Sequence, residues 1–200
     1  MTAIEWITDM CSGSPTSGVS AIERPRLATP FRATVDGQCY AAGTDGYRLV
    51  AVPGELAPER ADAPQVDWLF LAASSRARAT MRIAAMLKWA RHGVCRRCHG
   101  TGRHQCCGAF EHACSACATK RRHEEAHLDG LIGPARINRA YLASILRGAP
   151  GESVDVSTHG PMDPVMFYGD EWIGALIPRR GNGETCPVFA MDAGFSRVLP

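Results

Sequence analysis

The chain has 200 residues, a length that suits one substantial domain or one domain with a small insertion. Its apolar fraction of 46% and charged fraction of 21% exclude a disordered chain. The formal net charge of +2 excludes nucleic-acid binding driven by the charge of the whole molecule. The longest apolar run, residues 68–73, is too short for a membrane span, and no signal-peptide pattern is visible. We therefore expect a soluble, cytoplasmic protein with no membrane partner.

The first part of the chain predicts a helix followed by an antiparallel meander. Apolar residues at helical spacing predict a helix over residues 3–11. Strands are predicted over residues 31–35, 38–42 and 47–52, and the Asp-Gly dipeptide at 36–37 is typical of a hairpin turn.

The second part repeats this order. The absence of Pro and Gly over residues 66–91 predicts one long helix or two shorter ones. A further helix is predicted over residues 138–146, and strands over 154–156, 164–168 and 172–177. The pattern predicts an α+β fold made of two halves, each a helix followed by antiparallel strands, with a cysteine-rich segment between them.

Six of the nine cysteines lie within residues 95–117. The odd total and the missing signal peptide argue against a disulfide framework. Two Cys-x-x-Cys pairs, Cys95/Cys98 and Cys114/Cys117, are separated by fifteen residues, which is typical of a four-cysteine zinc site. Four thiolates fill the tetrahedral shell and leave no position for a substrate, so we predict a structural zinc ion.

Further zinc-type ligands lie between these pairs. His104 with Cys107, or Cys106 with His112, would replace one of the outer pairs or begin a second site. The outer four cysteines are the expected ligands, and the role of the inner residues stays open.

Positive charge is concentrated around the cysteines. Residues 91–127 contain seven Lys/Arg against three Glu, whereas the rest of the chain has fifteen Lys/Arg against seventeen acidic residues. A four-thiolate zinc centre, with a formal charge of about −2, offsets only part of this excess. The residues expected to contact phosphates or an acidic protein surface are Arg96, Arg97, Arg103, Arg121 and Arg122. The alternative is that these charges only keep the segment soluble.

Two stretches resemble the bacterial DNA polymerase III β sliding clamp. Residues 43–50, Gly-Thr-Asp-Gly-Tyr-Arg-Leu-Val, are similar to the family's Ala-Thr-Asp-Gly-His/Tyr-Arg-Leu-Ala segment. Residues 163–167 and 172–180 are similar to its C-terminal end, where a Pro-Val strand leads to Val-Met-Pro-Met-Arg-Leu. The resemblance covers about residues 31–52 and 131–180 and implies a sliding-clamp-like domain.

The cysteine segment is similar to the Cys-x-x-Cys-x-Gly-x-Gly zinc modules of J-domain chaperones, here Cys-Arg-Arg-Cys-His-Gly-Thr-Gly over residues 95–102. Cys117 departs from that pattern, because Ala-Thr-Lys follows it. The whole chain resembles small phage-encoded proteins that join a clamp-like domain to such an insertion. The expected boundaries are a clamp-like domain over 1–92 and 127–180, a zinc-binding insertion over 93–126 and a tail over 181–200.

The resemblance implies a non-enzymatic protein that engages DNA or a replication protein. The alternative is a phage inhibitor of a host enzyme or defence system, located in the host cytoplasm, that uses the fold as an interaction scaffold. No catalytic residue is expected, because Cys107 and His112 lie among zinc-type ligands. Neither the oligomeric state nor the partner's identity follows from the sequence.

A peptide groove is also implied by the clamp resemblance. Carried over by position, one wall consists of Thr44, Gly46, Tyr47 and Leu49, and the other of Ile177 and Pro178. The alternative is that Leu49 and Ile177 fill the core. Residues 65–70, Gln-Val-Asp-Trp-Leu-Phe, have a likeness to the Gln and Leu-Phe peptides that dock on sliding clamps, although Trp68 and Phe70 also suit a core.

Overall fold

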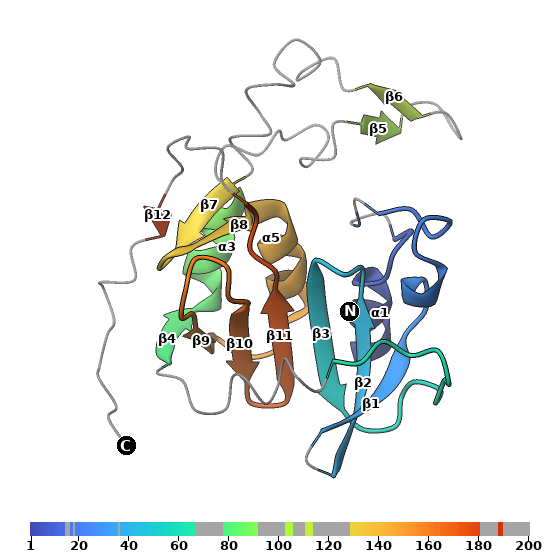
Figure 1. The fold of residues 1–200 in the computed structure, drawn as a ribbon. Coiled ribbons are helices and arrows are strands. Elements are labelled where there is room, and N and C mark those ends of the chain that lie inside the picture. The colour runs from blue at the N-terminus through green and yellow to red at the C-terminus, as the bar shows by residue number, and fades with distance from the viewer. Residues whose placement is uncertain are drawn as a thin grey trace.

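The computed structural model describes residues 1–14, 17, 19–35, 37–66, 78–91, 103–105, 111–113, 129–180 and 188–189. A seven-stranded sheet lies at the centre of this part of the chain (Figure 1). Its order is β1 (Phe31–Val35), β2 (Gln38–Thr44), β3 (Arg48–Pro53), β11 (Trp172–Leu176), β10 (Val165–Gly169), β9 (Ser153–Ser157) and β4 (Ala79–Arg82). All neighbours are antiparallel.

The strand order divides the sheet into two similar halves. β3 pairs with β11 in the middle, and β2 and β1 continue outward on one side as β10 and β9 do on the other. Each set of three strands follows a helix, α1 (Ala3–Asp9) in the first half and α5 (Arg139–Gly148) in the second. The predicted plan of two helix-plus-strand halves is confirmed.

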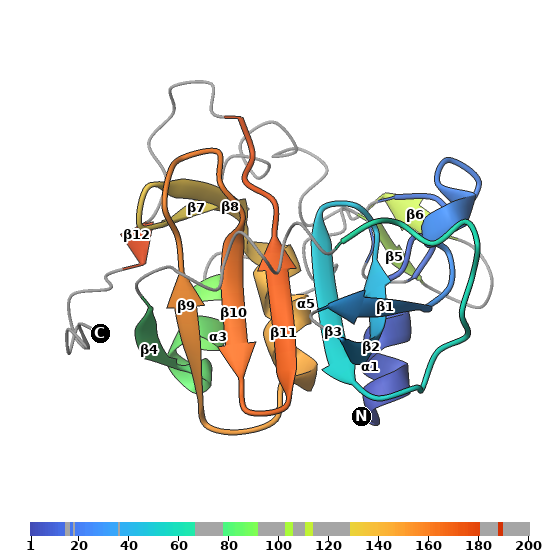
Figure 2. The same cartoon turned by 60° about the horizontal axis from the view of Figure 1, so that its bottom comes forward.

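Three helices cover one face of the sheet (Figures 1 and 2). Thr2 and Glu5 form a reciprocal capping box at the start of α1, and the Asn138 side chain accepts from the first amides of α5. The third helix is α3 (Ile83–Arg91), which packs beside α5. No helix in the described ranges is long and apolar enough to cross a bilayer.

The long helix expected over residues 66–91 is wrong in part. It is correct over α3, but residues 79–82 form strand β4, and residues 67–77 lie outside the described chain. Ala79 and Met81 are buried while Thr80 and Arg82 are exposed, which is the period-two alternation of a strand. The sequence did not show it, because Ala, Met and Arg are also good helix formers. Pairing with β9 fixes the strand, because tertiary contacts override local propensity.

Short strands complete the described chain. β7 (Asp129–Ile132) and β8 (Ala135–Asn138) form an unpredicted hairpin around Gly133, and β12 (Val188–Phe189) adds to it in parallel. β5 (Arg103–Gln105) pairs with β6 (Glu111–Ala113) inside the cysteine-rich segment. A single-turn 3-10 helix covers Pro25–Leu27.

The chain enters and leaves the cysteine-rich segment at adjacent points. A Cβ atom on Gly130 would lie 2.5 Å from the ring of Trp89, so the backbone at Gly130 packs directly on that side chain. Arg139 donates to the Trp89 carbonyl at 2.6 Å, and its guanidinium lies 5.1 Å from the Trp89 ring centroid. A segment whose ends meet in this way can be inserted without separating the elements on either side.

The sheet is apolar on both faces. Along β10 and β11, Val165, Phe167 and Trp172 pack under the helices, whereas Met166 and Ala175 pack on the opposite face. Antiparallel sheets commonly expose one face to water, so the second apolar face needs its own cover.

A buried ion pair lies where the two halves meet. Arg48 Nε donates to Asp45 Oδ2 at 3.0 Å, and both side chains have 0% exposure. Asp45 Oδ1 also accepts from the backbone amides of Tyr47 and Arg48, and Ser17 Oγ donates to Oδ2 at 3.0 Å. The carboxylate is therefore compensated by charge and by hydrogen bonds, as burial of a charged group requires.

The remaining donors of Arg48 reach both helices. Nη2 donates to the carbonyl of Asp9 at the end of α1, at 2.9 Å, and Nη1 donates to Ser144 Oγ in α5. One guanidinium thus joins the turn before β3 to a helix of each half.

We predict that Asp45→Asn destabilises the fold by about 3–5 kcal/mol, because it leaves the Arg48 guanidinium buried without a counter-charge. Urea denaturation measures the change. Asp62→Asn is the matched control, since Asp62 forms a surface ion pair with Arg60 at 2.8 Å and is 53% exposed. Its loss should hardly move the midpoint. Equal shifts in the two variants would contradict the role given to the buried pair.

Candidate functional site

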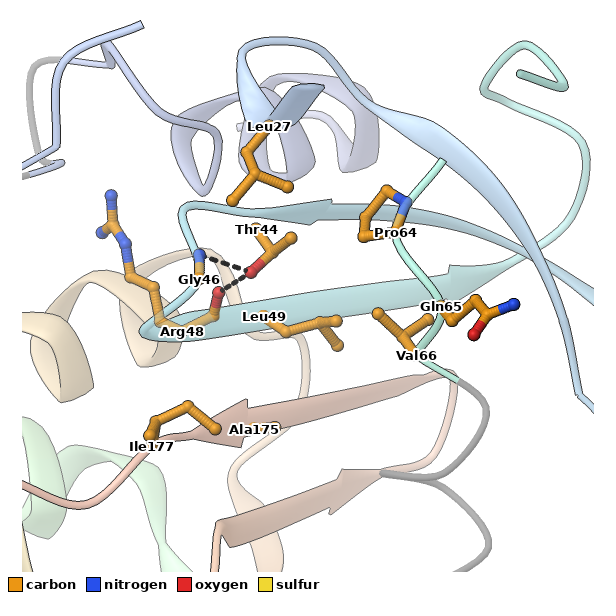
Figure 3. Close-up of a pocket in the computed structure, with 10 residues that line it drawn as sticks. All are labelled: Leu27, Thr44, Gly46, Arg48, Leu49, Pro64, Gln65, Val66, Ala175 and Ile177. Carbon is orange, nitrogen blue, oxygen red and sulfur yellow. Dashed lines mark hydrogen bonds between the residues drawn. The ribbon is translucent and has the colours of Figure 1, made fainter. Parts of the chain in front are cut away.

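A hollow of about 150 Å³ opens on the sheet face opposite the helices (Figure 3). Its floor is the junction of β3 and β11, where Leu49 and Ala175 are register partners. The lining is mainly apolar and consists of Leu27, Thr44, Gly46, Arg48, Leu49, Pro64, Gln65, Val66, Ala175 and Ile177. The hollow therefore lies where the two halves of the sheet meet.

The turn beside the hollow is fixed by its own hydrogen bonds. Thr44 Oγ1 donates to the Arg48 carbonyl at 2.6 Å and accepts from the Gly46 amide at 2.9 Å (Figure 3). Gly46 has a φ of 91°, and a Cβ atom there would lie 2.0 Å from Arg24 Nη1. The positive φ favours glycine at this position, and a Cβ atom there would displace the Arg24 guanidinium.

Aromatic and arginine side chains border this turn. Tyr47 stacks on Tyr141 with ring centroids 6.2 Å apart, and the Arg24 guanidinium lies 4.8 Å from the Tyr47 ring centroid. Arg24 Nη1 also donates to the Asp45 carbonyl at 3.1 Å. Tyr47 is held beside the hollow with 41% of its surface exposed, instead of lining it.

One wall of the hollow comes from the segment after β3. We call residues 54–66 the strap, which runs from the end of β3 around β1 and returns to the hollow (Figure 2). Its Pro58 carbonyl accepts from the Arg32 amide at 3.0 Å, and Arg60 donates to Thr29 Oγ1 at 2.6 Å. Val66 is 5% exposed and packs in the apolar cluster on this face. The strap thus covers the outer face of the first half.

Four residues predicted for the peptide groove line the hollow together, namely Thr44, Gly46, Leu49 and Ile177. The structure places Pro178 in the interior and Tyr47 outside the lining. The sequence reasoning missed Leu27, Arg48, Ala175 and the strap residues. Period-two alternation from Ile177 would have found Ala175, but no local signal reports that a loop folds back over the sheet.

Of residues 65–70, which resemble clamp-binding peptides, the structure describes the first two. Gln65 and Val66 line the hollow, with Gln65 exposed and Val66 buried in the core. Trp68 and Phe70 lie outside the described residues.

The expected zinc ligands Cys95, Cys98, Cys114 and Cys117 lie outside the described residues, as do Cys106, Cys107 and the arginines at 96, 97, 121 and 122. The backbones of Arg103, His104 and His112 are described, in β5 and β6. Cys11 is described and buried, and burial raises the pKa of its thiol to about 11, which disfavours the thiolate that metals bind.

No protein-family model and no curated protein matches the sequence. Among solved structures, the chain is similar to the DNA polymerase sliding clamp of Bacillus subtilis, with a TM-score of 0.54 and 11% identity over 89% of this chain and 61% of that one. For the DNA polymerase III beta subunit of Thermotoga maritima the TM-score is 0.53 and the identity 9%, over 88% of this chain and 63% of that one. For the Helicobacter pylori beta clamp bound to a DNA ligase peptide the TM-score is 0.51 and the identity 9%, over 89% of this chain and 62% of that one.

The chain spans about three fifths of the length of these clamps. At such low identity the similarity concerns the fold, not the activity. Three-dimensional similarity and the two-half topology together identify the fold as sliding-clamp-like.

Proposed function

We propose that this chain is a non-enzymatic interaction protein that engages a replication protein by accepting an apolar side chain of its peptide in the hollow. The observation that carries the proposal is an apolar hollow at the junction of β3 and β11, on the face that the helices leave uncovered. Concave apolar sites with a few polar groups at the rim are typical of peptide and ligand binding.

The size of the hollow suits one anchoring side chain. Its volume of about 150 Å³ is close to that of a cavity that accepts a benzene molecule, so a Leu or Phe side chain fits. Arg48 in the lining already has a charged partner, so the hollow offers shape and apolar surface in place of a free charge. The Helicobacter pylori clamp bound to a DNA ligase peptide provides a precedent on this fold.

We expect a synthetic peptide with a Gln and a terminal Leu-Phe pair to bind the wild type with a micromolar Kd, measured by fluorescence polarisation. Ile177→Glu introduces a charge at the half-buried rim and should weaken binding at least about tenfold, because the peptide anchor would then desolvate that charge. Ile22→Glu is the control, since Ile22 is 92% exposed and outside the lining. Absence of wild-type binding at high micromolar peptide, or equal weakening by both changes, would rule out the hollow as the site.

Contact with DNA is a second proposed function, and charge distribution favours the cysteine-rich segment for it. The helix layer has mixed charge in the described ranges, with Glu5 and Asp9 on α1 against Lys88 on α3 and Arg147 on α5. The concentrated positive charge lies within residues 91–127. Phosphate contacts are therefore proposed for Arg96, Arg97, Arg103, Arg121 and Arg122.

Replacing Arg96, Arg97, Arg121 and Arg122 by Ala should weaken DNA binding and reduce its salt dependence by about one unit of slope for each lost phosphate contact. A salt titration of binding to duplex DNA measures both quantities. The control replaces four exposed arginines outside the cysteine-rich segment, Arg26, Arg82, Arg147 and Arg180. If the control alone weakens binding, the DNA-binding surface lies outside the cysteine-rich segment. If neither set of changes weakens binding, the arginines of the cysteine-rich segment serve solubility.

A structural zinc ion held by Cys95, Cys98, Cys114 and Cys117 is proposed for the same segment. The pairing of Arg103 with Ala113 supports this proposal, because it places two positions near the ends of residues 99–113, the stretch between the cysteine pairs, side by side. Cys114 directly follows β6, and Cys98 lies five residues before β5. Zinc would supply folding energy that so short a segment cannot obtain from a core.

Elemental analysis of the chain purified without chelator should give about one or more zinc ions per molecule, and Cys95→Ser or Cys114→Ser should lower that content. Cys39→Ser is the control because Cys39 is free and half-buried in the sheet. A folded wild type without metal would disprove the zinc site.

A phage origin, a location in the host cytoplasm and inhibition of a host enzyme or defence system are further proposals that rest on the sequence resemblance. The inhibitor proposal gains support if neither the peptide nor DNA binds, since the fold would then act as a scaffold for a different protein surface.

A further inference from the structure

Strands β5 and β6 place two histidines directly opposite one another. His104 and His112 are register partners, between the pairs Arg103 with Ala113 and Gln105 with Glu111. In the sequence these histidines are eight residues apart, a separation that does not itself indicate proximity. The hairpin register brings them together.

The same register assigns the two histidines to one face of the hairpin. Successive residues of a strand belong to opposite faces, so His104 and His112 share a face, while both neighbouring pairs share the other. Facing residues of an antiparallel pair have Cβ atoms roughly 4.5–5.5 Å apart. A register shift of one residue would end this arrangement, so the juxtaposition is a property of the observed pairing.

We infer that this hairpin face is a second metal-binding site, with His104 and His112 as its two protein ligands for a divalent transition-metal ion of the zinc, nickel or copper class. Imidazole is a preferred ligand for these metals, with a metal–nitrogen distance of about 2.0–2.1 Å for zinc. Two nitrogens on one tetrahedral ion lie roughly 3.3 Å apart, a separation that imidazoles on facing strand positions can reach.

The site differs in kind from the four-cysteine centre. A four-thiolate shell is closed, whereas two histidines leave coordination positions to water or to a donor from another molecule. The metal here is therefore exchangeable. The inference does not depend on the hollow or on the four-cysteine ligands.

The experiment titrates zinc into the metal-free full chain by calorimetry and repeats the titration with Co²⁺, whose thiolate complexes absorb characteristically. The wild type should bind about two ions, of which one gives the thiolate absorption. His104→Ala and His112→Ala should each abolish binding of the ion that gives no thiolate absorption, and should leave the thiolate absorption of the first ion unchanged. Cys95→Ser should have the opposite effect, so failure of one site is distinguishable from failure of the other.

Gln105→Ala and Glu111→Ala are the matched controls, because they form the next facing pair on the opposite face, and they should leave both ions bound. In the His104→Ala/His112→Ala background, Gln105→His with Glu111→His rebuilds a facing pair and should restore the second ion. Retention of both ions in the histidine variants would overturn the inference. So would loss of the thiolate absorption in them, which would make the histidines part of the cysteine centre.

Discussion

The buried pair of Asp45 and Arg48 is the interaction on which the arrangement of the two halves depends. Removing the two charges from water is costly, and the pair persists because its donors and acceptors find partners in α1, in α5, in the segment after α1 and in the turn itself. Apolar packing alone would tolerate sliding of one half against the other. The β3–β11 ladder fixes the register of the two sheet halves, and the directed hydrogen bonds of one guanidinium hold a helix of each half at that junction.

A defined junction explains why a hollow persists there. The helices cover one apolar face of the sheet, and the strap covers the other face over the first half only. The strap ends at Val66 against Leu49 and Ala175, and no equivalent cover over β9–β11 occurs in the described ranges. The hollow marks the edge of that cover. A concave apolar site beside a rigid junction is the kind of site that binds a partner.

Sequence patterns predicted most strands of the seven-stranded sheet. Strands β1, β2, β3, β10 and β11 were found, because turn residues bound them and branched or aromatic residues fill them. β4 was missed since its Ala and Met suit a helix, and pairing with β9 decides its state. The clamp resemblance named four of the ten lining residues, Thr44, Gly46, Leu49 and Ile177, whereas the strap wall arises from a long-range fold-back. The facing of His104 and His112 likewise requires the register.

The segment after β11 connects the hollow to the residues that follow the cysteine-rich segment. Ile177 lines the hollow, and two residues later Arg179 pairs with Asp129 at 2.7 Å, where the chain returns from the cysteine-rich segment. Asp129 also pairs with Arg136 at 2.8 Å, and the Arg179 amide donates to the Arg136 carbonyl. Because so short a span connects them, Ile177 cannot shift far without straining the Asp129 contacts. A ligand in the hollow would therefore act on the same anchor, Asp129, at which the chain returns from the cysteine-rich segment.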